Sequence, residues 1–154
     1  MTDSSSSADN PQQAAHFEAA KLDLKLSVRL SADRNAVDQV VRSVMHVVRS
    51  QECAPGREDD IELALAEALA NAVVHGAKSD PSKTVECDVA CNAQGTILIV
   101  VRDPGPGFDP ATIADPCAGE NIYSHHGRGI FLINQLMDEV RFHKNGTEIH
   151  MIKK

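Results

Sequence analysis

Three short polar segments, each attached to an apolar element, constrain the fold of this chain more than any other feature. Glu67, Asn71 and His75 recur at every fourth position of a helical segment, so they share one stripe of that helix. The segment 103–108, Asp-Pro-Gly-Pro-Gly-Phe, follows an apolar strand, and 127–130, Gly-Arg-Gly-Ile, opens another helix. A fold that unites a carboxylate, an amide, a second acid and two glycine turns supplies the parts of a nucleotide site.

Hydrophobic periodicity predicts one α/β domain over residues 21–154, after a solvated, disordered tail at residues 1–20. Period-two or unbroken apolar runs predict strands at residues 22–30, 85–91, 96–101, 140–143 and 147–152. Helical spacing predicts helices around residues 37–48, 58–77 and 130–137. This order predicts a two-layer α/β (α+β) sandwich, with a mixed, mostly antiparallel sheet and helices on one face.

Local signals complete this prediction. Ser31 is expected to cap the first helix, and Gly76 is expected to cap the C-terminus of the second. The segment 109–126 is rich in Pro, Asp, Gly and Ser, which predicts a loop between the two glycine segments. Its length and position suggest a lid over a ligand.

Composition excludes several classes of protein. The net charge of −7 argues against a nucleic-acid surface, which needs clustered Lys and Arg. No window is long and apolar enough for a membrane span, and residues 1–13 lack the basic and apolar parts of a secretory signal. The four cysteines form no zinc pattern, so free thiols in a reducing cytoplasm are expected.

Glu67 and Asn71 could simply belong to a solvated helix face, but mixed charges would then surround them. Instead they lie in the sequence Ala-Leu-Ala-Glu-Ala-Leu-Ala-Asn-Ala-Val-Val. A buried amide and a buried carboxylate need partners. Mg²⁺ and a bound water would provide them, because Mg²⁺ prefers oxygen ligands and keeps several waters.

The ordered set of segments resembles the N box, G1 box and G2 box of the GHKL (Bergerat-fold) ATP-binding superfamily. Within it, the chain most resembles bacterial anti-sigma-factor serine-protein kinases, from about Leu22 to Lys153. The resemblance implies that Asn71 binds Mg²⁺ and that Glu67 is the general base. It also implies that the Asp103 carboxylate accepts the exocyclic amine of adenine.

The resemblance implies further nucleotide contacts. Gly105 and Gly107 would permit positive φ and a close approach of their loop to the base. Gly127, Arg128, Gly129 and Ile130 would bind phosphates at a helix N-terminus, and Thr147 would support the site through its hydroxyl. Many relatives carry an arginine just before these glycines, where this chain has His125 and His126. Arg128 is the residue that would compensate.

The resemblance therefore implies a cytoplasmic, homodimeric anti-sigma factor that is also an ATP- and Mg²⁺-dependent protein serine/threonine kinase. Its partners would be a sigma factor and a STAS-domain antagonist whose phosphorylation switches the partnership, with no direct binding of nucleic acid or membrane. One alternative is an ATP-binding or protein-binding module without phosphotransfer. Another is a detached sensor histidine kinase domain, disfavoured because no hairpin with a phosphoacceptor histidine precedes the domain.

Overall fold

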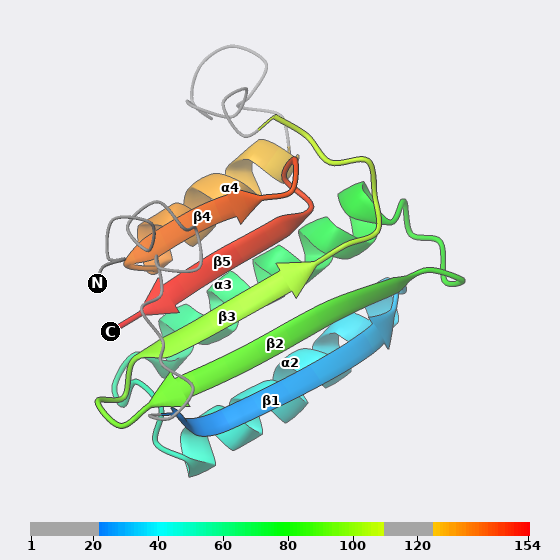
Figure 1. Cartoon of the computed structure of the whole chain (residues 1–154). Helices are drawn as coiled ribbons and strands as arrows, with labels where there is room; N and C mark the ends of the chain where they lie inside the picture. The colour runs from blue at the N-terminus through cyan, green and yellow to red at the C-terminus, as the bar shows by residue number, and fades with distance from the viewer. Residues whose placement is uncertain (1–21, 110–124) are drawn as a thin grey trace, which may run out of the picture.

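The computed structural model describes residues 22–109 and 125–154, and it forms one sheet covered by one layer of helices (Figure 1). In chain order the elements are β1 (Leu22–Ser31), α2 (Arg34–Ser50), α3 (Glu58–Asn71), the π-helical turn η3 (Ala72–Gly76), β2 (Thr84–Asn92), β3 (Ile97–Arg102), α4 (His125–Leu136), β4 (Glu139–His143) and β5 (Glu148–Lys153). Each strand and helix expected from the sequence is present. The tail at 1–20 and most of the segment 109–126 lie outside the described residues.

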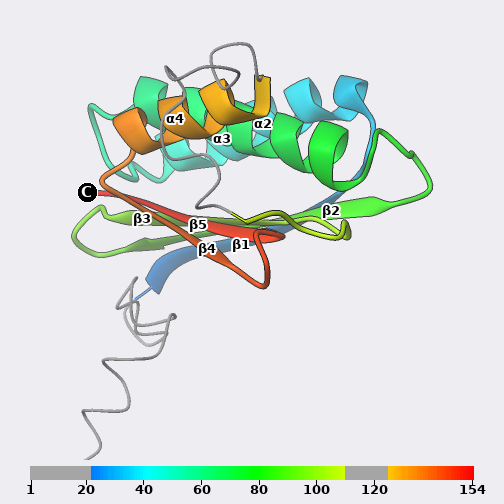
Figure 2. The same cartoon turned by 90° about the horizontal axis from the view of Figure 1, so that it is seen from above.

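The five strands are ordered β1-β2-β3-β5-β4 in the sheet. All four pairings between them are antiparallel, where the sequence prediction allowed for a mixed sheet. Figure 2 shows α2, α3 and α4 side by side in a layer on one face of the sheet. The predicted two-layer α/β sandwich is thereby confirmed.

The core lies between the sheet and the helix layer. The alternation of β2 sends Val85, Cys87, Val89 and Cys91 into this core, where each is buried. The helices contribute fully buried side chains such as Val44, Val48, Ile61, Leu65 and Leu69. Burial of this apolar surface holds α3 in the middle of the helix layer. The polar stripe of Glu67 and Asn71 on this helix then lies at the edge of the core.

The cysteines in the described ranges, Cys53, Cys87 and Cys91, are buried free thiols, as predicted. Burial raises the pKa of Cys87 to about 12, which keeps it protonated and unreactive. Cys117 lies outside the described residues.

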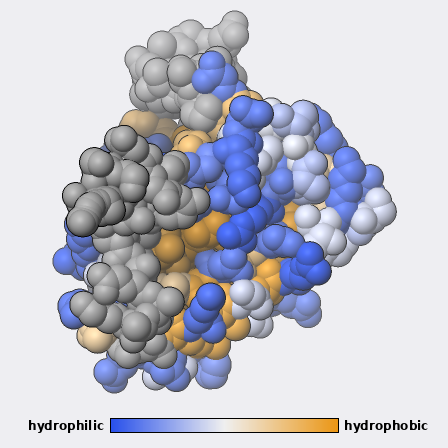
Figure 3. Space-filling model, viewed as in Figure 1, coloured by the Kyte–Doolittle hydropathy of each residue, from blue (hydrophilic) through white to orange (hydrophobic). Residues whose placement is uncertain are grey.

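The face of the sheet away from the helices carries charged side chains. Arg102 forms ion pairs there with Asp88 and Glu148, and Arg29 pairs with Glu86. Figure 3 shows hydrophilic residues running across this side of the molecule, with apolar residues between them. In the ranges that the structure describes, no helix combines the length and apolar character that a membrane crossing requires.

Two predicted caps are wrong. Asp33, not Ser31, caps α2, because its carboxylate accepts the N–H of Asn35 at 2.9 Å, while the Ser31 hydroxyl donates to the carbonyl of Pro81. Gly76 is not a left-handed cap, since the positive φ values at this helix end belong to Lys78 and Ser79. Glycine at position 76 instead allows the Asp103 carboxylate to approach the backbone closely, because a Cβ at this position would overlap that carboxylate.

Candidate functional site

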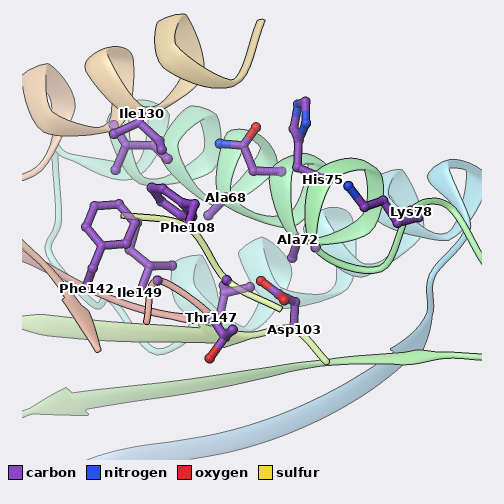
Figure 4. A pocket seen from close by; sticks show the side chains of 16 residues that line it. Ala68, Ala72, His75, Lys78, Asp103, Phe108, Ile130, Phe142, Thr147 and Ile149 are labelled. Atoms are coloured by element: carbon purple, nitrogen blue, oxygen red, sulfur yellow. The ribbon is translucent and has the colours of Figure 1, made fainter. Parts of the chain in front are cut away.

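A pocket opens between the C-terminal part of α3 with η3, the N-terminal half of α4 and the ends of β3 and β5 (Figure 4). Five residues predicted from the sequence line it, namely Asn71, Asp103, Gly107, Ile130 and Thr147. Apolar side chains complete its walls, among them Ala68, Ala72, Val101, Phe108, Ile133, Phe142 and Ile149. A cavity that combines apolar walls with a few converging polar groups is the usual form of a small-molecule site.

Asn71 contributes an amide with an unused acceptor to this pocket. Its Oδ1 atom is buried and has no hydrogen-bond partner within the described residues. A buried acceptor without a donor costs about 1–3 kcal/mol, so such atoms usually await a ligand or an ion. The orphaned oxygen fits the predicted role of a cation ligand.

Glu67 lies one helical turn before Asn71, at the contact between α3 and α4. It is not among the residues that line the pocket. Gly129 of α4 packs against both side chains, because a Cβ there would come within 2.8 Å of Glu67 Oε1 and 3.2 Å of Asn71 Nδ2. The two predicted segments are therefore adjacent, and glycine is what allows α4 to approach the carboxylate and the amide.

Asp103 follows β3 and points into the pocket (Figure 4). Its backbone N–H donates to the carbonyl of Thr147 at 2.9 Å, and its Oδ1 accepts the N–H of Gly105 at 2.8 Å. These bonds fix the carboxylate. Burial raises its pKa above the ordinary aspartate value, and the Gly105 N–H offsets part of that effect.

The two glycines after Asp103 act differently. Gly107 has φ +86°, as predicted, whereas Gly105 is not among the residues with positive φ. Gly105 instead lies against the carbonyl of Gly76, where a Cβ would overlap that oxygen. The expected left-handed conformation at Gly105 is wrong, but the expected close approach is present.

The first turns of α4 place the third predicted segment at the pocket's edge. Gly127 and Gly129 are buried, Ile130 lines the pocket and Arg128 is exposed. Arg128 is not among the lining residues. The side chains of His125 and His126 lie outside the described part, as does most of the lid predicted over 109–126.

Thr147 lines the pocket, but its hydroxyl donates to the carbonyl of Lys144 at 2.7 Å. This bond lies within the turn between β4 and β5. The hydroxyl oxygen can still accept a hydrogen bond, so a supporting role toward a ligand is compatible with this geometry.

Several lining residues were not predicted to belong to the site. Phe108 and Phe142 meet edge to face with ring centroids 5.4 Å apart and form one wall. Phe142 alternates like any strand residue, so nothing in the sequence marked it. Lys78, which also lines the pocket, follows the helix end and would pass for a surface lysine.

The π-helical turn η3 directly follows Asn71 and was expected as ordinary α-helix. The N–H of Ala77 donates to the carbonyl of Ala72, five residues earlier, at 2.9 Å. Widened turns of this kind occur often at functional sites. Here the turn carries His75 and Gly76 to the pocket, opposite Asp103.

The buried carboxylate predicts a pH-dependent stability in the absence of ligand. Because the folded-state pKa of Asp103 is raised, the native state holds its proton over a pH range where the unfolded chain has lost it. Stability from this group is present at pH below the ordinary value of 3.8 and is lost as the pH rises through the raised pKa. In urea unfolding, the stability of the wild type minus that of Asp103→Asn should therefore fall as pH rises through this window. A difference that grows with pH would show that the fold stabilises the carboxylate.

Comparison with known proteins identifies the domain. Residues 30–153 match the family model of the histidine kinase-like ATPase domain. The chain is similar to the serine-protein kinase RsbW of Bacillus licheniformis, with 35% identity over 106 residues, which cover 62% of this chain and 63% of that protein. RsbW of Staphylococcus aureus (strain MW2) is 34% identical over 102 residues, covering 62% of this chain and 64% of the relative. The anti-sigma F factor of Priestia megaterium is 26% identical over 103 residues, covering 61% and 67%.

The aligned parts span just under two thirds of the RsbW relatives, so these names describe proteins of which this chain matches a large portion. The family model, in contrast, covers all described elements from the end of β1 to β5. The sandwich and the glycine-bounded pocket over α3 agree with it, and the predicted family is confirmed. The chain belongs to the histidine kinase-like ATPase domain family.

Proposed function

We propose that this protein is an anti-sigma factor and an ATP-dependent protein serine/threonine kinase that phosphorylates a STAS-domain antagonist. The observation that carries the proposal is the buried, unpartnered Oδ1 of Asn71, a residue that lines the same pocket as Asp103 and lies one turn from Glu67. The similarity to RsbW and anti-sigma F factor supports the choice of kinase and partners.

The donor set fits Mg²⁺. Asn71 Oδ1 is a neutral oxygen ligand, and Mg²⁺ is commonly held by one or two protein oxygens together with phosphates and water. No group of three or more His, Cys, Asp or Glu side chains in the described ranges could form an all-protein cage, which Mg²⁺ does not require. When bound, Mg²⁺ would neutralise the charge of the nucleotide phosphates.

Asp103 would select adenine. Its carboxylate is anchored by the Gly105 N–H and accepts hydrogen bonds, so it can receive the exocyclic amine of the base. The apolar wall of Phe108 and Phe142 offers a surface for the rings of the nucleoside. The N–H groups at the start of α4, with Gly127 to Ile130, would meet the phosphates.

Glu67 would act as the general base. Its carboxylate takes the proton of the attacking serine or threonine hydroxyl as that oxygen bonds to the γ-phosphorus. The bond between the γ-phosphorus and the bridging oxygen breaks, and ADP leaves. The position of Glu67 beside Asn71 and Gly129 supports this role, since phosphoryl transfer would occur near the metal ligand and the glycine turn.

Two partners would compete for this protein in a cytoplasmic homodimer. One partner would be a sigma factor and the other the STAS-domain antagonist. The phosphorylation state of the antagonist would decide which of the two is bound. The second candidate is a nucleotide- or protein-binding module without transfer, favoured by the fact that Glu67 does not line the pocket itself.

The test of this function is transfer of label from γ-labelled ATP to STAS proteins of the same organism, alongside capture of its sigma factors. We expect serine or threonine labelling of one STAS protein and retention of one sigma factor. If ATP binds but no STAS protein is labelled, the binding module is the better description. If ATP does not bind, the kinase is wrong, and only a module that binds a protein partner remains.

A further inference from the structure

Lys78 is the one lysine or arginine among the described residues that line the pocket. It follows η3, and Figure 4 shows its side chain beside His75 with the amino end turned toward the pocket. The acidic side chains at the site are Asp103 and, one turn from Asn71, Glu67. A polyphosphate entering this pocket would meet the carboxylate of Asp103 and a single basic side chain, that of Lys78, among the described lining residues, with Glu67 nearby.

The backbone fixes where this side chain starts. Lys78 has φ +57°, and Ser79 has φ +55°, a conformation that is uncommon for residues other than glycine. Hydrogen bonds from Ala77 N–H to Ala72 O and from Ser79 N–H to Val73 O hold the turn. A lysine kept in a costly conformation at a pocket points to a function for its side chain.

The ammonium group is available for a ligand. Within the described residues the Lys78 side chain makes no ion pair or hydrogen bond, although Asp103 lines the same pocket. An ammonium donates and cannot accept, and it binds phosphate as a point charge. It would therefore read a phosphate group and would be a poor partner for the amine edge of adenine.

We propose that Lys78 binds a phosphate group of the nucleotide and so sets the preference of this pocket for adenosine phosphates over adenosine. This inference rests on the proposed binding of ATP and extends it to a residue outside the three glycine and helix segments. A simpler role exists, since a lysine after a helix end also interacts with the helix dipole. That role concerns folding alone and would not distinguish ATP from adenosine.

The experiment is calorimetry of the full chain with Mg·ATP, ADP and adenosine. Lys78→Met removes the charge and keeps the length of the side chain. We expect it to raise the Kd for ATP and ADP about tenfold or more, with the Kd for adenosine within about twofold of the wild type. Lys78→Arg should restore most of the affinity for ATP, and the loss in Lys78→Met should shrink in high salt.

Lys83→Met is the matched control, because Lys83 is an exposed lysine of the same connection that does not line the pocket. It should bind all three ligands like the wild type. An unchanged Kd for ATP in Lys78→Met, or an equal loss for ATP and adenosine, would overturn the role of Lys78 while leaving ATP binding intact. A wild type that binds neither ATP nor ADP would overturn the proposed function together with this inference.

Discussion

Glu67→Gln is expected to lower the rate of phosphoryl transfer about 10²–10⁴-fold while ATP still binds. The substitution keeps the shape of the side chain beside Gly129 and removes the proton acceptor. Glu67 does not line the pocket, so nucleotide affinity should change little. Capture of a sigma factor needs a surface and no base, so the variant should still retain it but fail to release it in response to ATP and antagonist.

Asn71→Ala should behave differently, because it removes the orphaned oxygen proposed to hold Mg²⁺. It should weaken Mg·ATP binding as well as transfer, with less effect on adenosine. Glu62→Gln is the matched control on the same helix, since Glu62 pairs with Arg49 away from the pocket. Transfer of label from ATP measures phosphoryl transfer, and calorimetry measures nucleotide binding. Together they separate the role of Glu67 as base from the role of Asn71 as metal ligand. If Glu67→Gln transfers as fast as the wild type, Glu67 is not the base.

The fold could be predicted from the sequence because alternation and helical spacing decide which face of each element is buried. β2 shows this directly, since its four buried residues, all apolar, alternate with residues that face away from the helices. The order of strands within the sheet depends on long-range pairing, which no local pattern contains. The all-antiparallel arrangement and the insertion of β5 between β3 and β4 therefore came from the structure.

The site could be predicted where a residue type has few explanations. A polar stripe inside an alanine-rich helix and glycines after strand ends were such signals, and the structure brings Asn71, Asp103 and Gly107 to one pocket. The sequence does not mark Phe142 and Lys78 as site residues, because a phenylalanine in a strand and a lysine in a loop are ordinary. At Gly76 the local pattern predicts only a helix end. The contact of Gly76 with Asp103 joins residues far apart in sequence, so no local pattern contains it.

Wild-type protein is expected to bind ATP more tightly than GTP, and Asp103→Asn is expected to lose this preference. Adenine presents an amine to the carboxylate, whereas guanine presents an oxygen at the same ring position, which the carboxylate would repel. Replacing one acceptor oxygen with an amide donor opposes the adenine amine, and mispairing a buried polar contact costs about 1–3 kcal/mol. Asparagine retains an oxygen for the Gly105 N–H, so the loop after β3 should keep its conformation.

Calorimetry with both nucleotides measures this preference, with Asp38→Asn on the exposed side of α2 as the matched control. Burial raises the pKa of Asp103, so its removal should not destabilise the ligand-free protein at neutral pH, and a weaker affinity could not be attributed to unfolding. The same raised pKa predicts that ATP affinity declines on acidification before ordinary aspartates protonate, and that Asp103→Asn lacks this decline. Equal affinity of the wild type for ATP and GTP would contradict recognition of the base by Asp103. The carboxylate can accept a hydrogen bond from the adenine amine but not from the guanine oxygen at the same ring position.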